Sequence, residues 1–300
     1  MTTKRTTVIL LNLFLFVSLV GCQITAGTTV APTEVPTATA VPPSPTPTEP
    51  PLAAKVNGEH LLLTEFQSEL QRLQAAEKEL GIQSTEAEQR QKVLDELIGQ
   101  ILLAQAAAQA GFTVDDITLQ AHIEKIAAQL GSAQELEKWI AENGYDTTSF
   151  RAALRRAIMA AWQRDQIANS IPTEMEQIHA RQILLLDEAL ANKVYQQLQS
   201  GADFATLAQQ YDPLLGGDLG WFPRGYLTQP VVEEAVFQLQ PGQYTPVIKS
   251  AIGFHIVLVL ERTIRPLEQD ARRMLQRQAV QEWVNKKREN STIEIRIGGG

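Results

Sequence analysis

The side chains best suited to chemistry in this chain are its histidines and its one cysteine. The histidines are His60, His122, His179 and His255. They are widely separated and show no metal-ligand spacing such as H-E-x-x-H. Cys22 is the single cysteine, so the chain cannot form an internal disulfide or a cysteine zinc cluster. The glycine-rich GGDLG at 216–220 lacks the G-K-S/T of a phosphate loop. We therefore expect no metal and no cofactor.

Residues 179–262 have the pattern of one small mixed domain. Strands are predicted at 179–185, 216–222 and 253–259, and helices at 189–199, 204–211 and 231–238. The predicted order is β-α-α-β-α-β.

Four stretches in this region carry a resemblance to a known family. They read HARQIL, ADFATLAQQY, GGDLGWFPRG followed by PVVEEAVFQLQPGQYTPV, and GFHIV. In order and spacing they resemble the parvulin (PpiC-type) family of peptidyl-prolyl cis-trans isomerases. The resemblance implies catalysis of rotation about X-Pro amides, whose barrier is about 20 kcal/mol because rotation breaks C–N resonance. Such catalysis needs an apolar slot for the proline ring, without a metal or a covalent step.

The resemblance also assigns roles to individual residues. The proline slot of the family maps onto Leu219, Phe222, Leu227 and Val231, and each of the four is equally compatible with a plain hydrophobic core. Phe222 fits the slot best, because an aromatic ring packs well against a pyrrolidine ring.

The polar residues match the family less closely. His255 matches one of its two facing histidines, whereas Gln182 stands at the other position. His179 is an earlier histidine of the pattern and does not substitute for it. The family normally has an acidic or thiol residue in the loop after the second helix. In this chain that loop is shorter, and Asp212 is the candidate for the acidic residue. Just before Gly253 the family often has Ser or Thr; here Ile252 stands there, with Ser250 close by.

These departures leave two outcomes open. Gln182 can donate and accept hydrogen bonds but cannot titrate. If the histidine pair is mainly structural, isomerase activity persists at a reduced level. If the shortened loop at Asp212 removes the polar partner of the amide, the domain only binds.

Helices on both sides of this domain must position it. Residues 64–170 have helical periodicity, with glycines where helices should end and helix-start signatures at Thr64/Gln67, Thr113/Asp116 and Ser132/Glu135. Residues 266–290 form another amphipathic helix, and TIEIRI at 292–297 reads as a strand. A lone terminal strand needs a partner, and residues 53–57 are the expected one.

The helical part resembles the N-terminal chaperone module of the SurA and PrsA foldases. The match lies in VNGE at 56–59 leading into Thr64-Glu65-Phe66, and in a late helix with Trp283 followed by a closing strand. We therefore predict an α+β protein in which a helical chaperone-like module carries an inserted parvulin domain. Its predicted parts are a signal peptide (1–21), a linker (22–52), the helical module (53–175), the parvulin domain (176–263), and a C-terminal helix and strand that return to the module (264–300).

The first residues predict export. Lys4 and Arg5 precede the apolar run 8–20, as in a secretory signal. The run ends in Leu-Val-Gly-Cys, which resembles a bacterial lipobox with Cys22 as the lipidated residue. The alternative is an uncleaved anchor with an incidental cysteine. The Pro/Thr-rich linker should be extended and, at about 3.1 Å per residue, could reach on the order of 90 Å.

The formal net charge of −8 argues against a nucleic-acid partner, for which a basic surface is expected. Three functions remain. The first is a lipid-anchored, extracytoplasmic isomerase acting on unfolded exported proteins that contain proline. The second is a non-catalytic holdase with a degenerate parvulin domain. The third is a structural or assembly factor of the cell envelope.

Overall fold

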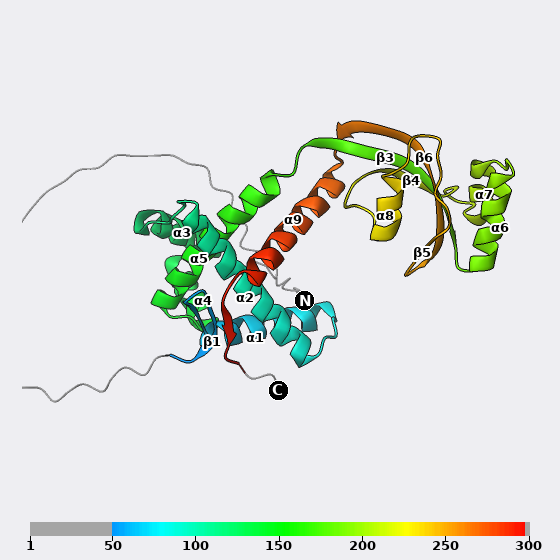
Figure 1. Ribbon diagram of the computed structural model, residues 1–300. Coiled ribbons are helices and arrows are strands. Elements are labelled where there is room, and N and C mark those ends of the chain that lie inside the picture. The colour runs from blue at the N-terminus through cyan, green and yellow to red at the C-terminus, as the bar shows by residue number, and fades with distance from the viewer. Residues whose placement is uncertain (1–49, 298–300) are drawn as a thin grey trace, which may run out of the picture.

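The computed structural model describes residues 50–297, which form two antiparallel sheets and the helices around them (Figure 1). The smaller sheet has the order β2-β1-β7 and the larger one the order β4-β3-β6-β5. The strands are β1 (Leu52–Val56), β2 (Glu59–Leu62), β3 (Glu174–Leu185), β4 (Asp218–Pro223), β5 (Ile248–Ser250), β6 (Gly253–Pro266) and β7 (Ile293–Ile295). The predicted α+β class is confirmed.

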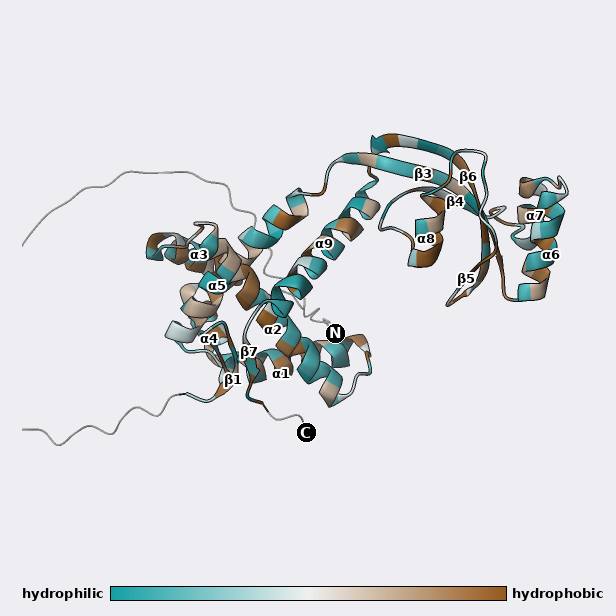
Figure 2. Cartoon of the chain, in the orientation of Figure 1, coloured by the Kyte–Doolittle hydropathy of each residue, from teal (hydrophilic) through white to brown (hydrophobic). Residues whose placement is uncertain are grey.

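Helices make up most of the rest of the described chain. They are α1 (Leu63–Leu80), α2 (Glu86–Gln109), α3 (Asp116–Leu130), α4 (Ala133–Glu142), α5 (Thr147–Asn169), α6 (Glu188–Gln199), α7 (Phe204–Tyr211), α8 (Pro230–Val236) and α9 (Gln269–Glu289). The first five follow one another in the helical module, and α9 packs back against α2 and α5. Figure 2 shows hydrophobic residues recurring along α8, while hydrophilic ones cover much of α9.

The helical module has its own core. Strands β1 and β2 and helices α1 and α2 contribute its buried residues, and Ile293 of β7 packs against them. Strand β7 pairs antiparallel with β1, with Ala54 opposite Ile295 and Val56 opposite Ile293. The predicted pairing of the two ends is therefore confirmed.

Helix boundaries follow the sequence signals with two exceptions. Ser132 caps α4 as predicted, since its side chain accepts from the Glu135 N–H at 3.1 Å. The Thr64 cap is wrong, because α1 follows β2 directly and begins one residue before Thr64. The Thr113 cap is also wrong, because the Asp115 carboxylate takes the N-cap position of α3.

The larger sheet is covered on both faces. Helices α6 and α7 cover one face, where their apolar side chains pack against Ile183 and Ile256. Helix α8 covers the other, packing against Ile178, Val257 and Phe222. Figure 1 shows α8 and the α6–α7 pair on opposite sides of the sheet. The order β-α-α-β-α-β is confirmed, with the short strand β5 as an addition before β6.

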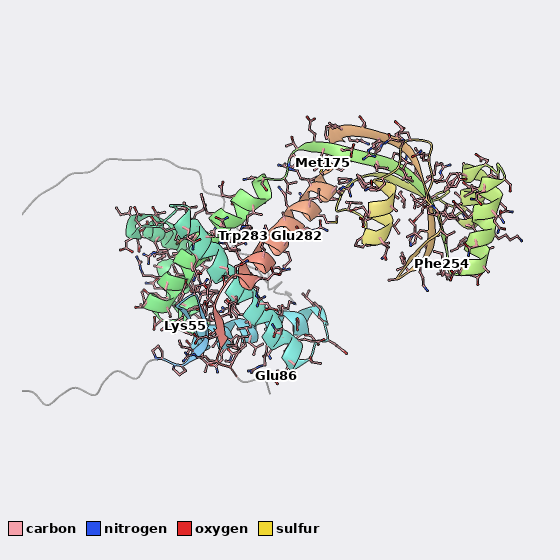
Figure 3. The ribbon with its side chains drawn as sticks, in the orientation of Figure 1. Lys55, Glu86, Met175, Phe254, Glu282 and Trp283 are labelled. Carbon is pink, nitrogen blue, oxygen red and sulfur yellow. The ribbon has the colours of Figure 1, made fainter. Side chains whose placement is uncertain are left out.

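The predicted domain borders can be compared with the strands of the structure. The signal peptide (1–21), Cys22 and the linker up to residue 49 lie outside the described residues. Leu52, predicted as the last linker residue, opens β1. The borders at 175/176 and 263/264 fall inside β3 and β6, because these strands pair continuously from Glu174 opposite Pro266. Figure 3 shows Met175 and Phe254 at the two ends of this long pair.

Candidate active site

His255 and Gln182 meet on the α8 face of the larger sheet. Residues directly opposite one another in an antiparallel pair point to the same face. His255 lies opposite Leu184, and Gln182 lies opposite Val257. The two side chains come together, with His255 Nδ1 3.4 Å from Gln182 Oε1.

The hydrogen bonds of His255 define its tautomer. Gln182 Oε1 can only accept, so Nδ1 carries the ring proton and donates it. Nε2 is then an acceptor and takes the hydroxyl proton of Ser250, whose Oγ lies 2.7 Å away. Ser250 Oγ in turn accepts from the Ile252 N–H at 3.1 Å. The ring is buried, and burial lowers the pKa of His255 below its ordinary value, so the imidazole is neutral at pH 7.

An apolar cluster occupies the same face of the sheet. Phe222 is fully buried in it and packs edge-on against Phe237, with ring centroids 6.1 Å apart. Leu219 and Leu227 are partly buried and pack against the same cluster. Three of the four predicted slot residues therefore lie together.

The fourth predicted slot residue is not among the buried residues of this cluster. The side chain of Val231 is 50 % exposed. Its neighbour Val232 is buried in the cluster instead, because α8 turns only one side toward the sheet. Its role as a slot residue stays a prediction.

Asp212 ends α7 and holds the loop that follows. Its carboxylate accepts from the N–H groups of Leu215, at 3.2 Å, and Gly217, at 3.0 Å. These backbone hydrogen bonds lower the pKa of Asp212. The Gly217 carbonyl then accepts from the Gln182 N–H at 2.8 Å. Asp212 is thus linked to the site through the backbone of the loop.

His179 lies away from His255. It is opposite Trp221 and Glu261 in the sheet, and its ring stacks on Trp221 with centroids 5.4 Å apart. Its Nε2 lies 2.9 Å from Asp218 Oδ1. The expectation that His179 does not replace the missing histidine agrees with this placement.

Glu233 holds the loop that carries Leu227, and the sequence did not reveal it. Its buried carboxylate accepts from three consecutive backbone N–H groups, at 2.8 Å from Gly225, 2.9 Å from Tyr226 and 3.0 Å from Leu227. The loop that carries Leu227 is therefore fixed by α8. An acidic residue three positions after Pro230 reads only as a first-turn helix residue, so no local signal distinguishes it.

The arrangement suits chemistry without proton transfer. A neutral imidazole and a neutral amide side chain lie on the same face of the sheet as the apolar cluster. Across residues 50–297, no group of three or more His, Cys, Asp and Glu side chains is placed to hold a metal ion. Over the same range, no helix is both long and apolar enough to cross a membrane.

Two family models match this chain. The model of the PPIC-type PPIASE domain matches residues 171–261. The model of the SurA-like N-terminal domain matches residues 6–164, which is more than half of the chain.

Among curated relatives, the foldase protein PrsA of Caldanaerobacter subterraneus subsp. tengcongensis is 32 % identical over 193 residues, or 60 % of this chain and 60 % of that protein. The chaperone SurA of Methylobacillus flagellatus is 31 % identical over 230 residues, covering 64 % of this chain and 52 % of that protein. The chain thus spans between half and two thirds of the length of these relatives.

Solved structures also match. The peptidylprolyl isomerase PrsA of Bacillus anthracis is 24 % identical with a TM-score of 0.44, covering 69 % of this chain and 99 % of that one. PrsA of Bacillus cereus is 19 % identical with a TM-score of 0.47, covering 81 % of this chain and 91 % of that one.

Proposed function

Because this chain belongs to the SurA/PrsA family of foldases and carries a PPIC-type parvulin domain, we propose that it catalyses cis–trans isomerisation of X-Pro bonds in unfolded exported proteins. The observation that carries this proposal is the neighbourhood of His255. A neutral, doubly hydrogen-bonded imidazole adjoins Gln182, on the sheet face that also carries Leu219, Phe222 and Leu227.

The physical argument starts from the amide. Its planar form owes its stability to a charge-separated resonance structure, and the barrier to rotation is about 18–20 kcal/mol. The twisted form loses this charge separation, so it is less polar than the planar form. Apolar surroundings and neutral side chains therefore favour the twisted amide over the planar one. In this account Leu219, Phe222 and Leu227 hold the proline ring, while the His255–Gln182 pair shapes the polar side of the site.

A proline-limited refolding reaction tests this proposal on an unfolded chain. A small protein whose slow refolding phase reflects X-Pro isomerisation is diluted from denaturant with and without the full-length chain. We expect the slow phase to accelerate with the concentration of the chain, and His255→Ala to weaken the acceleration. A slow phase that keeps its rate at every concentration would contradict the proposal.

A holdase is the second candidate function, and one feature of the helical module favours it. An open groove of about 780 Å³ lies between α2, α5 and α9. Small and apolar side chains such as Ala157, Ala160 and Val284 line it, together with the amides of Gln100 and Gln281. Charged side chains also line it: Glu88, Lys92, Asp95, Glu96, Arg164 and Arg288. Apolar contacts and amide hydrogen bonds together suit an extended polypeptide.

Two readouts in one sample separate the candidates. The holdase interpretation expects the chain to suppress aggregation of an unfolded client while its slow refolding phase stays unchanged. Ala157→Phe, which narrows the groove, should then weaken the suppression. If Ala157→Phe leaves suppression intact, the groove is not the site of binding.

We further propose that Cys22 is lipidated and anchors the protein outside the cytoplasm. The support is the sequence alone: a basic start, an apolar run and a small residue before the single cysteine. In bacteria that express the full chain, the protein should appear in the membrane fraction and incorporate labelled fatty acid. Cys22→Ser should abolish the label; a labelled Cys22→Ser protein would rule out this attachment point.

A further inference from the structure

The loop that carries Leu227 contacts the C-terminal helix α9. We name residues 225–227 of this loop the slot loop. Figure 1 shows the chain between β4 and α8 reaching the N-terminal half of α9. Gly225 lies against that helix, because a Cβ on Gly225 would be 3.0 Å from Leu275 Cδ2 and 3.5 Å from Gln278 Oε1. The parvulin domain and the helical module therefore meet at the slot loop.

The contact is apolar and close. Leu275 is 8 % exposed, and Ala271, one turn earlier on the same face of α9, is 6 % exposed. Gly225 has φ +87°, a conformation that favours glycine. Since glycine has no side chain, the backbone of the slot loop packs directly against Leu275.

The slot loop thus has two supports from different parts of the chain. Glu233 of α8 accepts from all three of its N–H groups. Leu275 of α9 packs against Gly225. Glu233 ties the loop to α8, and Leu275 limits its movement toward α9.

Helix α9 is itself fixed to the helical module. Near Leu275, the Gln276 side chain donates from Nε2 to the carbonyl oxygen of Ala168, at 3.1 Å, near the end of α5. Toward its C-terminal end, Val284 packs into a core cluster with residues of α2 and α5. The position of Leu275 is therefore set by the helical module.

From these contacts we propose that Leu275 is a positioning residue of the isomerase. It acts through Gly225 and keeps Leu227 beside Leu219 and Phe222, with which Leu227 packs in one cluster. The inference rests on the proposed isomerase function and adds a role for the helical module in it. Because a small misplacement of a binding group weakens catalysis strongly, the slot should work fully only while α9 supports it.

Substitution of Leu275 in the full-length chain tests the inference. The KM and kcat for the peptide Ala-Ala-Pro-Ala-Ala come from NMR exchange rates, and its dissociation constant from a titration. In Leu275→Ala we expect KM to rise roughly fivefold with kcat nearly unchanged. The amides of the slot loop should exchange with deuterium roughly tenfold faster. Leu275→Met conserves the side-chain volume and should restore both values.

Three further variants make the test specific. Leu275→Val is the milder truncation, should raise KM about twofold, and replaces Leu275→Ala if that chain does not fold. Leu136→Ala removes a leucine that is 4 % exposed in a separate core cluster of the helical module. It should lower stability without changing KM. Ile264→Ser, at a side chain that is 69 % exposed, is the surface control and should change neither readout.

Each outcome decides the inference. An unchanged KM in the truncated chains, or slot-loop amides that exchange at the natural rate, overturns it. A rise of KM in Leu136→Ala as large as in Leu275→Ala also overturns it, because the effect would then follow from lost stability alone. If the natural chain binds the peptide without accelerating exchange, and Leu275→Ala weakens that binding roughly fivefold, the isomerase proposal falls and the positioning role stands.

Discussion

At the scale of single residues, His255 has the best-defined environment. Its ring is buried, its two nitrogens are bonded to Gln182 and Ser250, and burial lowers its pKa. A buried neutral histidine makes stability depend on pH. The imidazole of the unfolded chain takes up a proton near pH 6.5, whereas that of the folded chain resists protonation.

We therefore predict a loss of stability in mild acid. Above about pH 6.5 both states are neutral and the contribution of His255 is fully present. As the pH falls below that value, the unfolded state binds the proton first, so the free energy of unfolding falls by at most about 1.4 kcal/mol per pH unit for this one proton. Urea unfolding between pH 7.5 and 5 measures it.

The control uses the other buried histidine. His122 on α3 also has a lowered pKa, through burial and the nearby charge of Lys125, so it adds a slope of the same sign. His255→Asn should remove the share of His255 and leave that of His122, together with the smaller shares near pH 5 of carboxyl groups whose pKa is lowered. An unchanged slope in His255→Asn would contradict the assignment of a neutral His255.

Gln182 gives a second prediction at this scale. Its contact with His255 is long, at 3.4 Å, and a glutamine side chain is flexible. Gln182→His should restore two facing imidazoles and raise kcat/KM severalfold, while Gln182→Ala removes the acceptor of the Nδ1 proton and should lower it. Peptide exchange measured by NMR checks both. A Gln182→Ala chain as active as the natural one would show that the pair has no part in catalysis.

The sequence predicted which residues approach the site better than it predicted their orientation. The family resemblance indicated Leu219, Phe222 and Leu227, which pack in one cluster, and His255 and Gln182, whose side chains meet. It did not show that Val231 would be half exposed while Val232 is buried, since the facing side of a seven-residue helix depends on how the helix docks. The carboxylate bonds of Asp212 and Glu233 depend on loop geometry, which no local pattern encodes.

At the scale of elements, a glycine fixes how the loop after α7 meets β3. Gly217 has φ +72°, and a Cβ there would lie 1.9 Å from the carbonyl oxygen of Gln182. Gly220, at φ +65°, has open space around the same position. Substitutions at these two glycines therefore distinguish two contributions to the loss of stability: the clash with a nearby backbone atom and the strain of a positive φ.

Alanine substitutions at these two glycines should differ strongly. Gly220→Ala should lower the free energy of unfolding by about 1–2 kcal/mol, the cost of the left-handed conformation. Gly217→Ala should cost on the order of 3 kcal/mol more, because the backbone must move. Chemical unfolding of both chains checks this. Equal losses would show that the loop does not lie against Gln182.

Glu233 makes a prediction about the loop that carries Leu227. In Glu233→Gln the amide oxygen can still accept from the N–H groups of Tyr226 and Leu227, but the amide NH2 then faces the Gly225 N–H and cannot accept from it, at a cost of roughly 2 kcal/mol. The looser loop should raise KM more than it lowers kcat. Glu234→Gln, at the exposed neighbour, is the control and should change stability by less than about 0.5 kcal/mol. Equal KM values for the two variants would exclude the positioning role.

Element boundaries could be predicted from the sequence where a hydrophobic period continues over many residues. They could not be predicted where one element leads directly into the next. The helices of residues 64–170 and the cap at Ser132 were predicted correctly. The cap at Thr64 was wrong because β2 leads directly into α1, which removes the separate capping residue. Strand β5 was not predicted, because its three residues are too few to show the alternation of apolar and polar side chains that identifies a strand.

At the scale of the whole molecule, the C-terminal helix and strand pack against the N-terminal helical module. The larger sheet is inserted between α5 and α9, and α9 and β7 then rejoin the helical module. Arg156 of α5 pairs with Glu65 of α1 within this module, where both side chains are largely buried. The return was predictable because a single terminal strand must find a partner, and β1 offered an open edge.

The packing of β7 on the helical module predicts that substitutions in β7 change the free energy of unfolding by an amount that depends on their position. Ile293→Asp places a charge against the core formed by β1, α1 and α2, so it should lower the free energy of unfolding by roughly 2 kcal/mol or more. Ile295→Asp, at a side chain that is 54 % exposed, is the matched control and should have a much smaller effect. Thermal unfolding followed by circular dichroism measures both. Similar losses at the two positions would contradict the docking of β7 on this core.

The claim on which the account depends is that the domain around His255 accelerates rotation about X-Pro bonds. NMR exchange spectroscopy of a proline peptide measures this directly, through the rate at which the cis and trans signals interconvert. With the full-length chain at a small fraction of the peptide concentration, we predict faster exchange, reduced by His255→Ala and unaffected by Ile264→Ser. An exchange rate equal to that of the free peptide at every concentration of the chain would contradict it.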